Sequence, residues 1–486
     1  MSSDADPTTR RSYLRLVGTA TLAALAGCGD RGPSEETETE RRETTADSET
    51  ETTDDTQTES PGDTSTETPP DSVTEESEKS IEELRTQYDT VVNVRDAGAD
   101  ASGERVVNPV LDDNLDDDTL LYFPPGRYRL EPWQVIDYRN LGVVGKDATL
   151  VPPEGEQGYW LMCDELRQFH FQGFELDTRA RGVAPANFLT VTGGTNVVRD
   201  VSLRGHRRIP RGGFEISVGD PNAELLFDRV SLPDGSTAGN AIYTFPSSVG
   251  KLTLRDCYVE HWAEGLYASP HSGPLSVLGG YYGNNGIDQV RVGGGPSGAL
   301  VRGVTVRVDQ PKQPSQKPNM RGIWMEEGAT ARIENCDVAI TNLTGTYSSG
   351  GIVVGRQAGA ATIRNTRIRV DEDVPAINLR NPVEGAQGSS MPSMGRLPTD
   401  RRVTCEDVRI EGDAAAGPAI LTTRRDDCLF DRLCLHQPNG KRDGIAIMHA
   451  DGCTVRDSTI AVGGRAITTE GARVRQLRVR RQGSCS

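Results

Sequence analysis

Aromatic, acidic and basic side chains recur beside one short pattern that repeats along most of this chain. The pattern is a small residue, then Ile or Leu, then any residue, then an apolar residue, as in residues 322–325 and 351–354. Successive side chains of a strand point to opposite faces, so the residue after Ile or Leu should point outward. Stacked copies would align these outward residues in one column, which comprises Glu215, Tyr243, Tyr267, Asp288, Trp324, Val353 and Asn378. A second column, two residues further on, comprises Ser269, Val290, Glu326, Arg380 and Thr423.

The first column favours carbohydrate chemistry. Flat aromatic faces suit sugar rings. Only 5% of the residues are aromatic, so Tyr243, Tyr267 and Trp324 on one strand face are unusual. Asp288 and Glu326, on adjacent copies of the repeat, could serve as the carboxylate pair of a glycosidase.

Two further roles stay open for residues on or near these columns. Asp288, Glu326 and Glu327 could bind Ca²⁺, which prefers oxygen ligands. His271 could act as a general base, although a single histidine in a loop is more often only polar. The alternative for the whole face is an ordinary exposed ladder of side chains on a repeat protein.

Short strands must position these residues. A second pattern runs apolar, charged, Asn or Asp, two variable residues, apolar; it begins at residues 198, 254, 333, 363 and 455, with weaker copies at 227, 301, 405, 430 and 474. It predicts two short strands joined by a tight turn, because Asp and Asn tolerate a left-handed backbone. The Ile or Leu of the first pattern falls at or near residues 161, 189, 214, 242, 266, 287, 323, 352, 377, 420, 445 and 467. Three short strands in each unit of roughly 25 residues predict an all-β parallel solenoid of about twelve coils over residues 86–486.

Two segments near the start of this region resemble a known family. Residues 92–99 (Val-Asn-Val-Arg-Asp-Ala-Gly-Ala) and 121–128 (Leu-Tyr-Phe-Pro-Pro-Gly-Arg-Tyr) look like the entry segment of the pectate-lyase-like superfamily. The resemblance extends over nearly all of residues 86–486 and implies a right-handed parallel β-helix. Its ligand groove would follow the strand that carries the small–Ile pattern. Residues 100–105 depart from the family's acidic, Thr-containing stretch. A short helix near residues 109–117 is expected to cover the open end of the first coil.

The resemblance also implies chemistry. Pectate lyases use an arginine base with Ca²⁺ held by carboxylates, and residues 396–401 match an Arg-any-Pro-any-any-Arg lyase pattern. The Trp-any-Asp-His pattern that accompanies it and the Gly-His-Gly segment of polygalacturonases are both absent from the sequence. Two insertions, residues 309–318 and 381–402, would border the groove face and could form its walls.

The N-terminal residues are typical of an exported lipoprotein. Residues 9–15 (Thr-Arg-Arg-Ser-Tyr-Leu-Arg) resemble the twin-arginine export motif, and residues 25–28 (Leu-Ala-Gly-Cys) resemble a lipobox. In a signal peptide spanning residues 1–28 this implies lipidation of Cys28 and anchoring to the outer face of the cell membrane. Residues 29–85 are rich in Thr, Glu, Ser and Asp and are expected to form a disordered tether. Together with the acidic, arginine-rich composition, these features are typical of halophilic archaea.

Charge and cysteine spacing limit the partners. The formal net charge is -18, with 20 acidic and 5 basic residues in 30–85, which argues against nucleic-acid binding. Cys428 and Cys453 lie one coil apart at equivalent places, so we expect them to be in contact and within reach of a disulfide.

Together these observations predict a lipid-anchored surface solenoid that binds and cleaves an acidic polysaccharide, as a lyase or a glycosidase. The expected substrate-binding residues are Tyr243, Tyr267, Trp324 and Asn378, and the expected catalytic residues are Asp288, Glu326, Arg380 and His271. Ca²⁺ is the only cofactor that the sequence suggests. The alternative is a non-catalytic carbohydrate-binding or cell-envelope module, which the lack of a complete catalytic motif favours.

Overall fold

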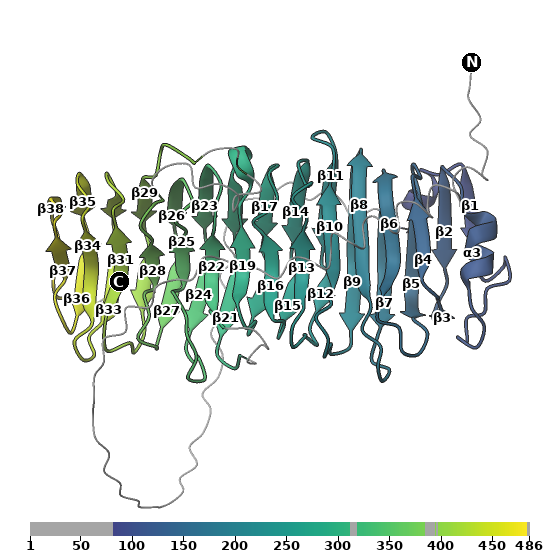
Figure 1. The fold of residues 1–486 in the computed structure, drawn as a ribbon, viewed down its shortest axis with the longest axis horizontal. Helices are drawn as coiled ribbons and strands as arrows, with labels where there is room; N and C mark the ends of the chain where they lie inside the picture. The colour runs from purple at the N-terminus through teal and green to yellow at the C-terminus, as the bar shows by residue number, and fades with distance from the viewer. Residues whose placement is uncertain (1–80, 312–317, 384–393, 395–396, 484–486) are drawn as a thin grey trace, which may run out of the picture. The chain divides into compact units, whose positions relative to one another are not determined.

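The computed structural model describes residues 81–311, 318–383, 394 and 397–483. In this part the chain winds into a parallel β-solenoid whose coils stack along one axis (Figure 1). One sheet contains 13 strands, one from each coil, so the solenoid has about 13 turns. This confirms the predicted fold class and adds a first coil, whose strand lacks the small residue of the repeat pattern. The predicted signal segment with Cys28, and residues 29–80 of the predicted tether, lie outside the described residues.

One face of the solenoid is sheet B, in which every strand pairs in parallel with its equivalent in the next coil. Sheet B consists of β4 (Trp133–Ile136), β6 (Tyr159–Arg167), β8 (Ala186–Gly193), β10 (Phe214–Val218), β13 (Asn240–Thr244), β16 (Glu264–Ala268), β19 (Asp288–Val292), β22 (Arg321–Met325), β25 (Ile352–Val354), β28 (Ile377–Leu379), β31 (Pro418–Thr423), β34 (Asp443–Met448) and β37 (Ile467–Glu470). Its inward residues stack; for example, Ile323, Ile352 and Ile377 are in register and fully buried. Truncating one of them to Ala would cost about 2–5 kcal/mol.

The other 25 strands form sheet A, to which most coils contribute two short strands. Sheet A consists of β1 (Thr90–Asn93), β2 (Thr119–Phe123), β3 (Gly126–Arg129), β5 (Gly142–Val151), β7 (His170–Asp177), β9 (Thr195–Arg204), β11 (Glu224–Asp228), β12 (Ser231–Leu232), β14 (Lys251–Arg255), β15 (Tyr258–Glu260), β17 (Leu275–Leu278), β18 (Tyr281–Gly283), β20 (Ala299–Arg302), β21 (Thr305–Val308), β23 (Thr330–Glu334), β24 (Asp337–Ile340), β26 (Ala360–Arg364), β27 (Arg367–Val370), β29 (Val403–Glu406), β30 (Arg409–Glu411), β32 (Leu429–Asp431), β33 (Cys434–Gln437), β35 (Cys453–Arg456), β36 (Thr459–Val462) and β38 (Val474–Leu477).

The second repeat pattern marks the turn between the two strands of each sheet A pair. Asp256, Asn335 and Asn365 adopt positive φ angles of 51°, 55° and 47° at this turn, as the sequence predicts. The apolar residues that open the predicted copies, from residue 198 to residue 455, are in register from coil to coil. The last copy is displaced, because Gln476 rather than Val474 pairs with Val455.

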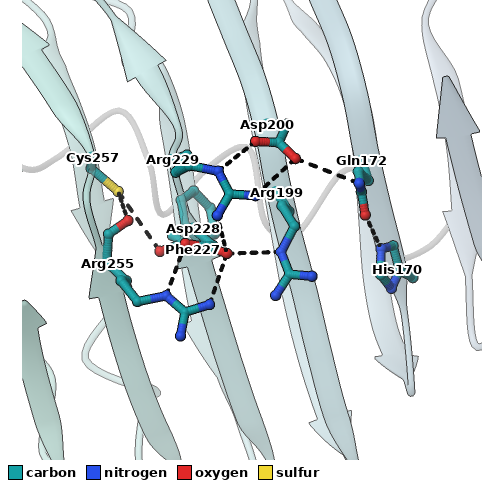
Figure 2. Close-up of polar contacts among 9 residues, drawn as sticks. All are labelled: His170, Gln172, Arg199, Asp200, Phe227, Asp228, Arg229, Arg255 and Cys257. Atoms are coloured by element: carbon teal, nitrogen blue, oxygen red, sulfur yellow. Dashed lines mark hydrogen bonds and ion pairs between the residues drawn. The ribbon is translucent and has the colours of Figure 1, made fainter. Parts of the chain in front are cut away.

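Charged side chains beside these turns form a ladder across neighbouring coils (Figure 2). We call Arg199, Asp200, Asp228, Arg229 and Arg255 the charge ladder. The fully buried Asp228 carboxylate accepts hydrogen bonds from Arg199 Nε at 2.8 Å and from Arg255 Nη2 at 2.8 Å. Arg229 Nη1 donates to the same carboxylate at 3.3 Å, and its Nε donates to Asp200 at 2.7 Å. The Asp228 carboxylate therefore meets arginines from three successive coils, whereas Asp200 meets Arg229 alone among the arginines of the ladder.

Two short helices precede or cover the first coils. In α3 (Asn108–Asn114), near the predicted helix, Leu111 is fully buried in the main core. In α2 (Ile81–Arg85), Leu84 packs on Leu120 and Val144, so residues 81–85 are ordered and do not belong to the predicted tether. A single-turn 3₁₀ helix, η1 (Gly295–Ser297), follows β19. Among the described residues, no helix is long and apolar enough to cross a membrane.

Candidate functional site

The outer face of sheet B carries the predicted first column, with one correction. In successive coils its positions are occupied by Glu215, Tyr243, Tyr267, Arg291, Trp324, Val353 and Asn378. Arg291 takes the place predicted for Asp288. Asp288 lies three residues earlier, at the start of β19, and is fully buried.

The corner before β19 explains this correction. Val290, and not Ile287, pairs with Leu266 at the inward position. The corner extends through Ile287 because Gln289 closes it against Asn285. Gln289 Nε2 donates to the Asn285 carbonyl at 2.9 Å, and Gln289 Oε1 accepts the Asn285 N–H at 2.8 Å. The strand therefore starts later than the sequence pattern indicates, and every outward assignment in this coil moves with it.

Aromatic rings form a continuous row along this face. We call Tyr159, Phe188, Tyr243, Phe245, Tyr267 and Trp324 the aromatic ladder; all six side chains are partly exposed. From Tyr159 to Tyr267, successive ring centroids are between 5.1 and 5.8 Å apart. The Arg291 guanidinium continues the row, 3.6 Å from the centroid of Tyr267 and 4.5 Å from that of Trp324. Edge and cation–π contacts thus link the rings into one surface.

A cluster of charges lies against the Trp324 end of the aromatic ladder. We call Glu264, Asp288, Arg291, Arg321 and Glu326 the acid–arginine network. Arg291 Nε and Nη2 donate to the two oxygens of Glu326 at 2.7 and 2.8 Å, and Arg291 Nη1 donates to Glu264 at 2.9 Å. Arg321 Nε donates to Asp288 at 2.5 Å, and its guanidinium lies 3.4 Å from the Trp324 centroid. Three carboxylates thus share two guanidinium groups.

Burial and this excess of carboxylates raise the proton affinity of the network. Burial raises the pKa of Glu264 to about 8, and the Asp288 carboxylate adds to the effect, although Arg291 opposes it. Burial also raises the pKa of Asp288, against the attraction of Arg321. Burial lowers the pKa of Arg291, but the carboxylates of Glu326 and Glu264 outweigh it and hold that pKa well above its ordinary value. At neutral pH Glu264 can therefore hold a proton, while Arg291 cannot release one.

A second, isolated carboxylate lies further along the aromatic ladder. The Tyr159 hydroxyl donates to Glu215 Oε2 at 2.6 Å. Burial raises the pKa of Glu215, although this hydrogen bond lowers it. The face therefore presents acidic groups at two places along the row of rings.

The predicted second column forms in part: Gly293 takes the place predicted for Val290, which is fully buried at an inward position, and Gly355 lies between Glu326 and Arg380. Its order is Ser269, Gly293, Glu326, Gly355 and Arg380. Gly293 has no side chain between Ser269 and Glu326, so the Ser269 hydroxyl donates to Glu326 Oε2 at 2.5 Å across the intervening coil. A Cβ at position 293 would lie 2.2 Å from the Ser269 carbonyl oxygen. Arg380 lies two coils beyond Glu326, about 10 Å away at the usual strand spacing.

The remaining predicted site residues lie apart from the network or are enclosed. His271 is fully buried; its Nδ1 contacts Ser248 Oγ at 2.8 Å and its Nε2 contacts the Pro274 carbonyl at 3.3 Å. Burial lowers the pKa of His271 to about 4. Asn378 Nδ2 donates to the Ser349 carbonyl at 2.9 Å, with the side chain half-buried. His271 thus faces the interior, where it cannot reach a polysaccharide.

The calcium ligands proposed from the sequence do not converge. Asp288 and Glu326 direct their oxygens to arginines, and Glu327 is buried. Among the described residues, no group of three or more His, Cys, Asp and Glu side chains is arranged to hold a metal ion. Asp288 and Glu326 are instead paired with the guanidinium groups of Arg321 and Arg291.

One buried guanidinium holds both ends of the predicted wall at residues 381–402. Arg425 Nε donates to the Arg380 carbonyl at 3.0 Å, and its Nη1 donates to the Arg401 carbonyl at 3.0 Å. Parts of both insertions lie outside the described residues: residues 384–393 of this insertion, with Arg396 of the lyase pattern, and residues 312–317 of the other. The base of this insertion is thus tied to the end of a sheet B strand.

Cys428 and Cys453 lie in adjacent coils, as the sequence predicts, but both are free thiols. Each sulfur makes a hydrogen bond to the Arg425 carbonyl, at 3.3 and 3.5 Å. The predicted contact is therefore present without the disulfide. Cys434 is disulfide-bonded. The predicted lipidation site, Cys28, lies outside the described residues.

Sequence reasoning missed Glu264, Arg291 and Arg321. The sequence does contain a signal for Glu264. In four consecutive coils a polar residue stands two positions before the inward apolar residue. These residues are Asn240, Glu264, Asp288 and Arg321. Nothing local indicates that Arg291 occupies the outward column, because that depends on the corner before β19.

No protein-family model matches the chain, and no curated protein matches it. Solved structures with a similar arrangement include the Streptococcus pneumoniae surface protein and adhesin PfbA, at 11% identity and a TM-score of 0.43, covering 81% of this chain and 99% of that chain. The Yersinia enterocolitica family 28 exopolygalacturonase is 11% identical with a TM-score of 0.35, covering 80% of this chain and 78% of that chain. The A-module of the Azotobacter vinelandii mannuronan C-5 epimerase AlgE4 is 13% identical with a TM-score of 0.27, covering 81% of this chain and all of that module.

Proposed function

We propose that the outer face of sheet B binds a polysaccharide along the aromatic ladder. The observation that carries this proposal is the row of partly exposed rings from Tyr159 to Tyr267, which the Arg291 guanidinium links to Trp324. An extended row of flat apolar faces with polar groups beside it matches an extended chain of sugar rings. A solenoid face with no ligand would have no need to place six aromatic side chains in one partly exposed row.

We further propose that the protein hydrolyses a glycosidic bond at the acid–arginine network. Glycoside hydrolysis needs a protonated carboxyl group as acid and a second carboxylate as base or nucleophile. Glu264, with its pKa raised to about 8, supplies the proton, and Glu326, held on the same guanidinium, supplies the carboxylate. The high pKa of Arg291 opposes its use as a lyase base, so hydrolysis is the better match to this site.

The non-catalytic alternative predicted from the sequence has one observation in its favour. Glu264 is only 4% exposed, so a substrate must displace its covering side chains to reach it. If the protein is a non-catalytic binding module, the acid–arginine network would serve to hold the aromatic ladder rigid. We retain export and lipid anchoring through Cys28 as part of the proposal, since a surface location would give such a face access to a polysaccharide.

Incubation with uronate-containing and neutral polysaccharides tests these proposals. New reducing ends without absorbance from an unsaturated sugar are expected, and Glu264→Gln should abolish them while leaving binding intact. Arg432→Gln, on the solenoid surface away from sheet B, is the matched control and should change neither. Unsaturated products would contradict hydrolysis. Binding without products would favour the non-catalytic module, and no binding across the panel would overturn the proposed function.

A further inference from the structure

A cavity of about 790 Å³ opens beside the ends of sheet B at which β8 and β10 begin. Loops that lead from sheet A into sheet B in consecutive coils enclose it. Its polar lining comprises Gln157, Thr178, Arg179, Arg181, His206, Arg208 and Asp234. None of these residues belongs to the aromatic ladder or to the acid–arginine network.

The one carboxylate in this lining is already compensated. Asp234 Oδ2 accepts hydrogen bonds from Arg204 Nε at 3.0 Å and from the Gly205 N–H at 2.7 Å. Although burial opposes it, these contacts hold the pKa of Asp234 below its ordinary value. Arg204 is not part of the lining, so the negative charge of Asp234 is balanced from behind the cavity wall.

The arginines of the lining are only partly compensated. Arg179 donates to Asp177 at 2.8 Å and to Glu175 at 2.5 Å. Arg181 and Arg208 are exposed, and neither makes an ion pair within the part of the chain that the structure describes. His206 contacts the Asp234 carbonyl through Nδ1 at 3.0 Å. The cavity therefore carries two guanidinium groups whose charge no carboxylate balances, in a protein with a net charge of -18.

The cavity and the aromatic ladder share a loop. Arg211, three residues after Arg208, places its guanidinium 6.0 Å from the centroid of Tyr159, the first ring of the ladder. Ala184 lines the cavity two residues before β8, which carries Phe188. A polysaccharide on the first rings of the ladder would thus pass beside the cavity mouth.

We propose that this cavity binds an anionic substituent, a carboxylate or a sulfate ester, of a sugar residue next to the aromatic ladder. The inference rests on the proposed polysaccharide binding and adds to it a site, separate from the aromatic ladder, that would recognise the acidic substituent. Arginine presents a planar fork of donors that matches such oxyanions, and a partly enclosed site strengthens the pairing. The uncompensated pair Arg181 and Arg208 would recognise the charge, and the ladder would hold the sugar rings.

Binding of polygalacturonate and of its fully methyl-esterified form tests this inference, because esterification removes the charge of each carboxylate and leaves the sugar backbone unchanged. Wild-type protein should bind polygalacturonate more tightly. The double variant Arg181→Gln/Arg208→Gln should lose about tenfold in affinity for polygalacturonate and less than about twofold for the ester, as expected for two lost charge-assisted contacts. The charge-matched control, Arg475→Gln/Arg481→Gln, changes two exposed arginines in the last coil and should behave like wild type.

Free galacturonate, glucose 6-sulfate and glucose separate this site from polymer binding. We expect one or both of the anionic sugars to raise the melting temperature of wild type and of the control variant but not of Arg181→Gln/Arg208→Gln; glucose should raise none. Whichever anion protects identifies the substituent. If the double variant binds polygalacturonate as tightly as wild type, the anion site is overturned while polysaccharide binding stands. If the anionic sugars protect wild type but no polymer binds, the polysaccharide proposal fails and the anion site stands.

Discussion

The acid–arginine network of sheet B and the charge ladder of sheet A use the same residue types with opposite results. In the charge ladder, Asp228 meets three arginines, and although burial opposes it, they hold its pKa below the ordinary value (Figure 2). In the network three carboxylates share two arginines, and burial raises the pKa of Glu264 to about 8. The first arrangement favours charged carboxylates and stabilises a turn. The second raises the proton affinity of a carboxyl group beside a row of aromatic rings, and perturbed carboxyl groups of this kind are enriched at functional sites.

The largest expected difference between the two regions concerns the loss of one arginine. Arg291→Gln leaves the buried Glu264 and the partly exposed Glu326 without their shared partner, which should lower the free energy of unfolding by about 3 kcal/mol. Arg255→Gln in the charge ladder leaves Asp228 with two arginines and should cost about 1 kcal/mol. Urea unfolding followed by circular dichroism measures both. Equal losses in the two variants would contradict the distinction between the regions.

The dependence of stability on pH should have opposite signs in the two regions. The pKa of Glu264 is higher in the folded protein, about 8, than in an unfolded chain, roughly 4.3. Between these values the folded state holds more protons, so the free energy of unfolding should fall as pH rises. Asp228 has a lowered pKa, so its stabilisation is present above its unfolded pKa and is lost as pH falls through its folded pKa.

Urea unfolding of Glu264→Gln and Asp228→Asn between pH 3 and pH 9 measures these contributions. Glu264→Gln should reduce the fall in the free energy of unfolding between roughly pH 4.3 and 8. The part of that fall due to Asp288, whose pKa is also raised, should remain. Asp228→Asn should leave that decline unchanged and remove stability mainly above about pH 4. A Glu264→Gln variant with the wild-type profile would show that the pKa of Glu264 is the same in the folded and the unfolded chain.

Ligand binding should separate the aromatic ladder from the other exposed aromatic pair. Trp324→Ala removes a ring at one end of the ladder and should weaken binding to a polysaccharide by about tenfold, or about 1.4 kcal/mol. Tyr258 and Tyr281 stack on sheet A with centroids 4.9 Å apart, and Tyr258→Ala should leave binding unchanged. Isothermal titration with the same polymer measures both variants. If Tyr258→Ala loses affinity and Trp324→Ala does not, the polysaccharide binds to sheet A and not to the aromatic ladder.

The sequence predicts the coils better than the site, for a physical reason. The strand and turn patterns are local, so the left-handed turns at Asn335 and Asn365 and most of the stacked positions follow from residue types alone. The network depends on which residue of β19 faces outward, and hydrogen bonds between Gln289 and Asn285 decide this. A shift of three residues there exchanges Asp288 for Arg291 and changes this position of the column from acidic to basic.

The smallest expected effect tests how tightly the network is coupled. Ser269→Ala removes one hydrogen bond to Glu326 and should cost about 1 kcal/mol. Ser276→Ala, a partly exposed position in β17, is the matched control and should cost less. If Ser269 and Arg291 position the same carboxylate, the losses in Ser269→Ala and Arg291→Gln should not add in the double variant. Strict additivity would mean that Glu326 is held by Arg291 alone, and that Ser269 only fills the space beside Gly293.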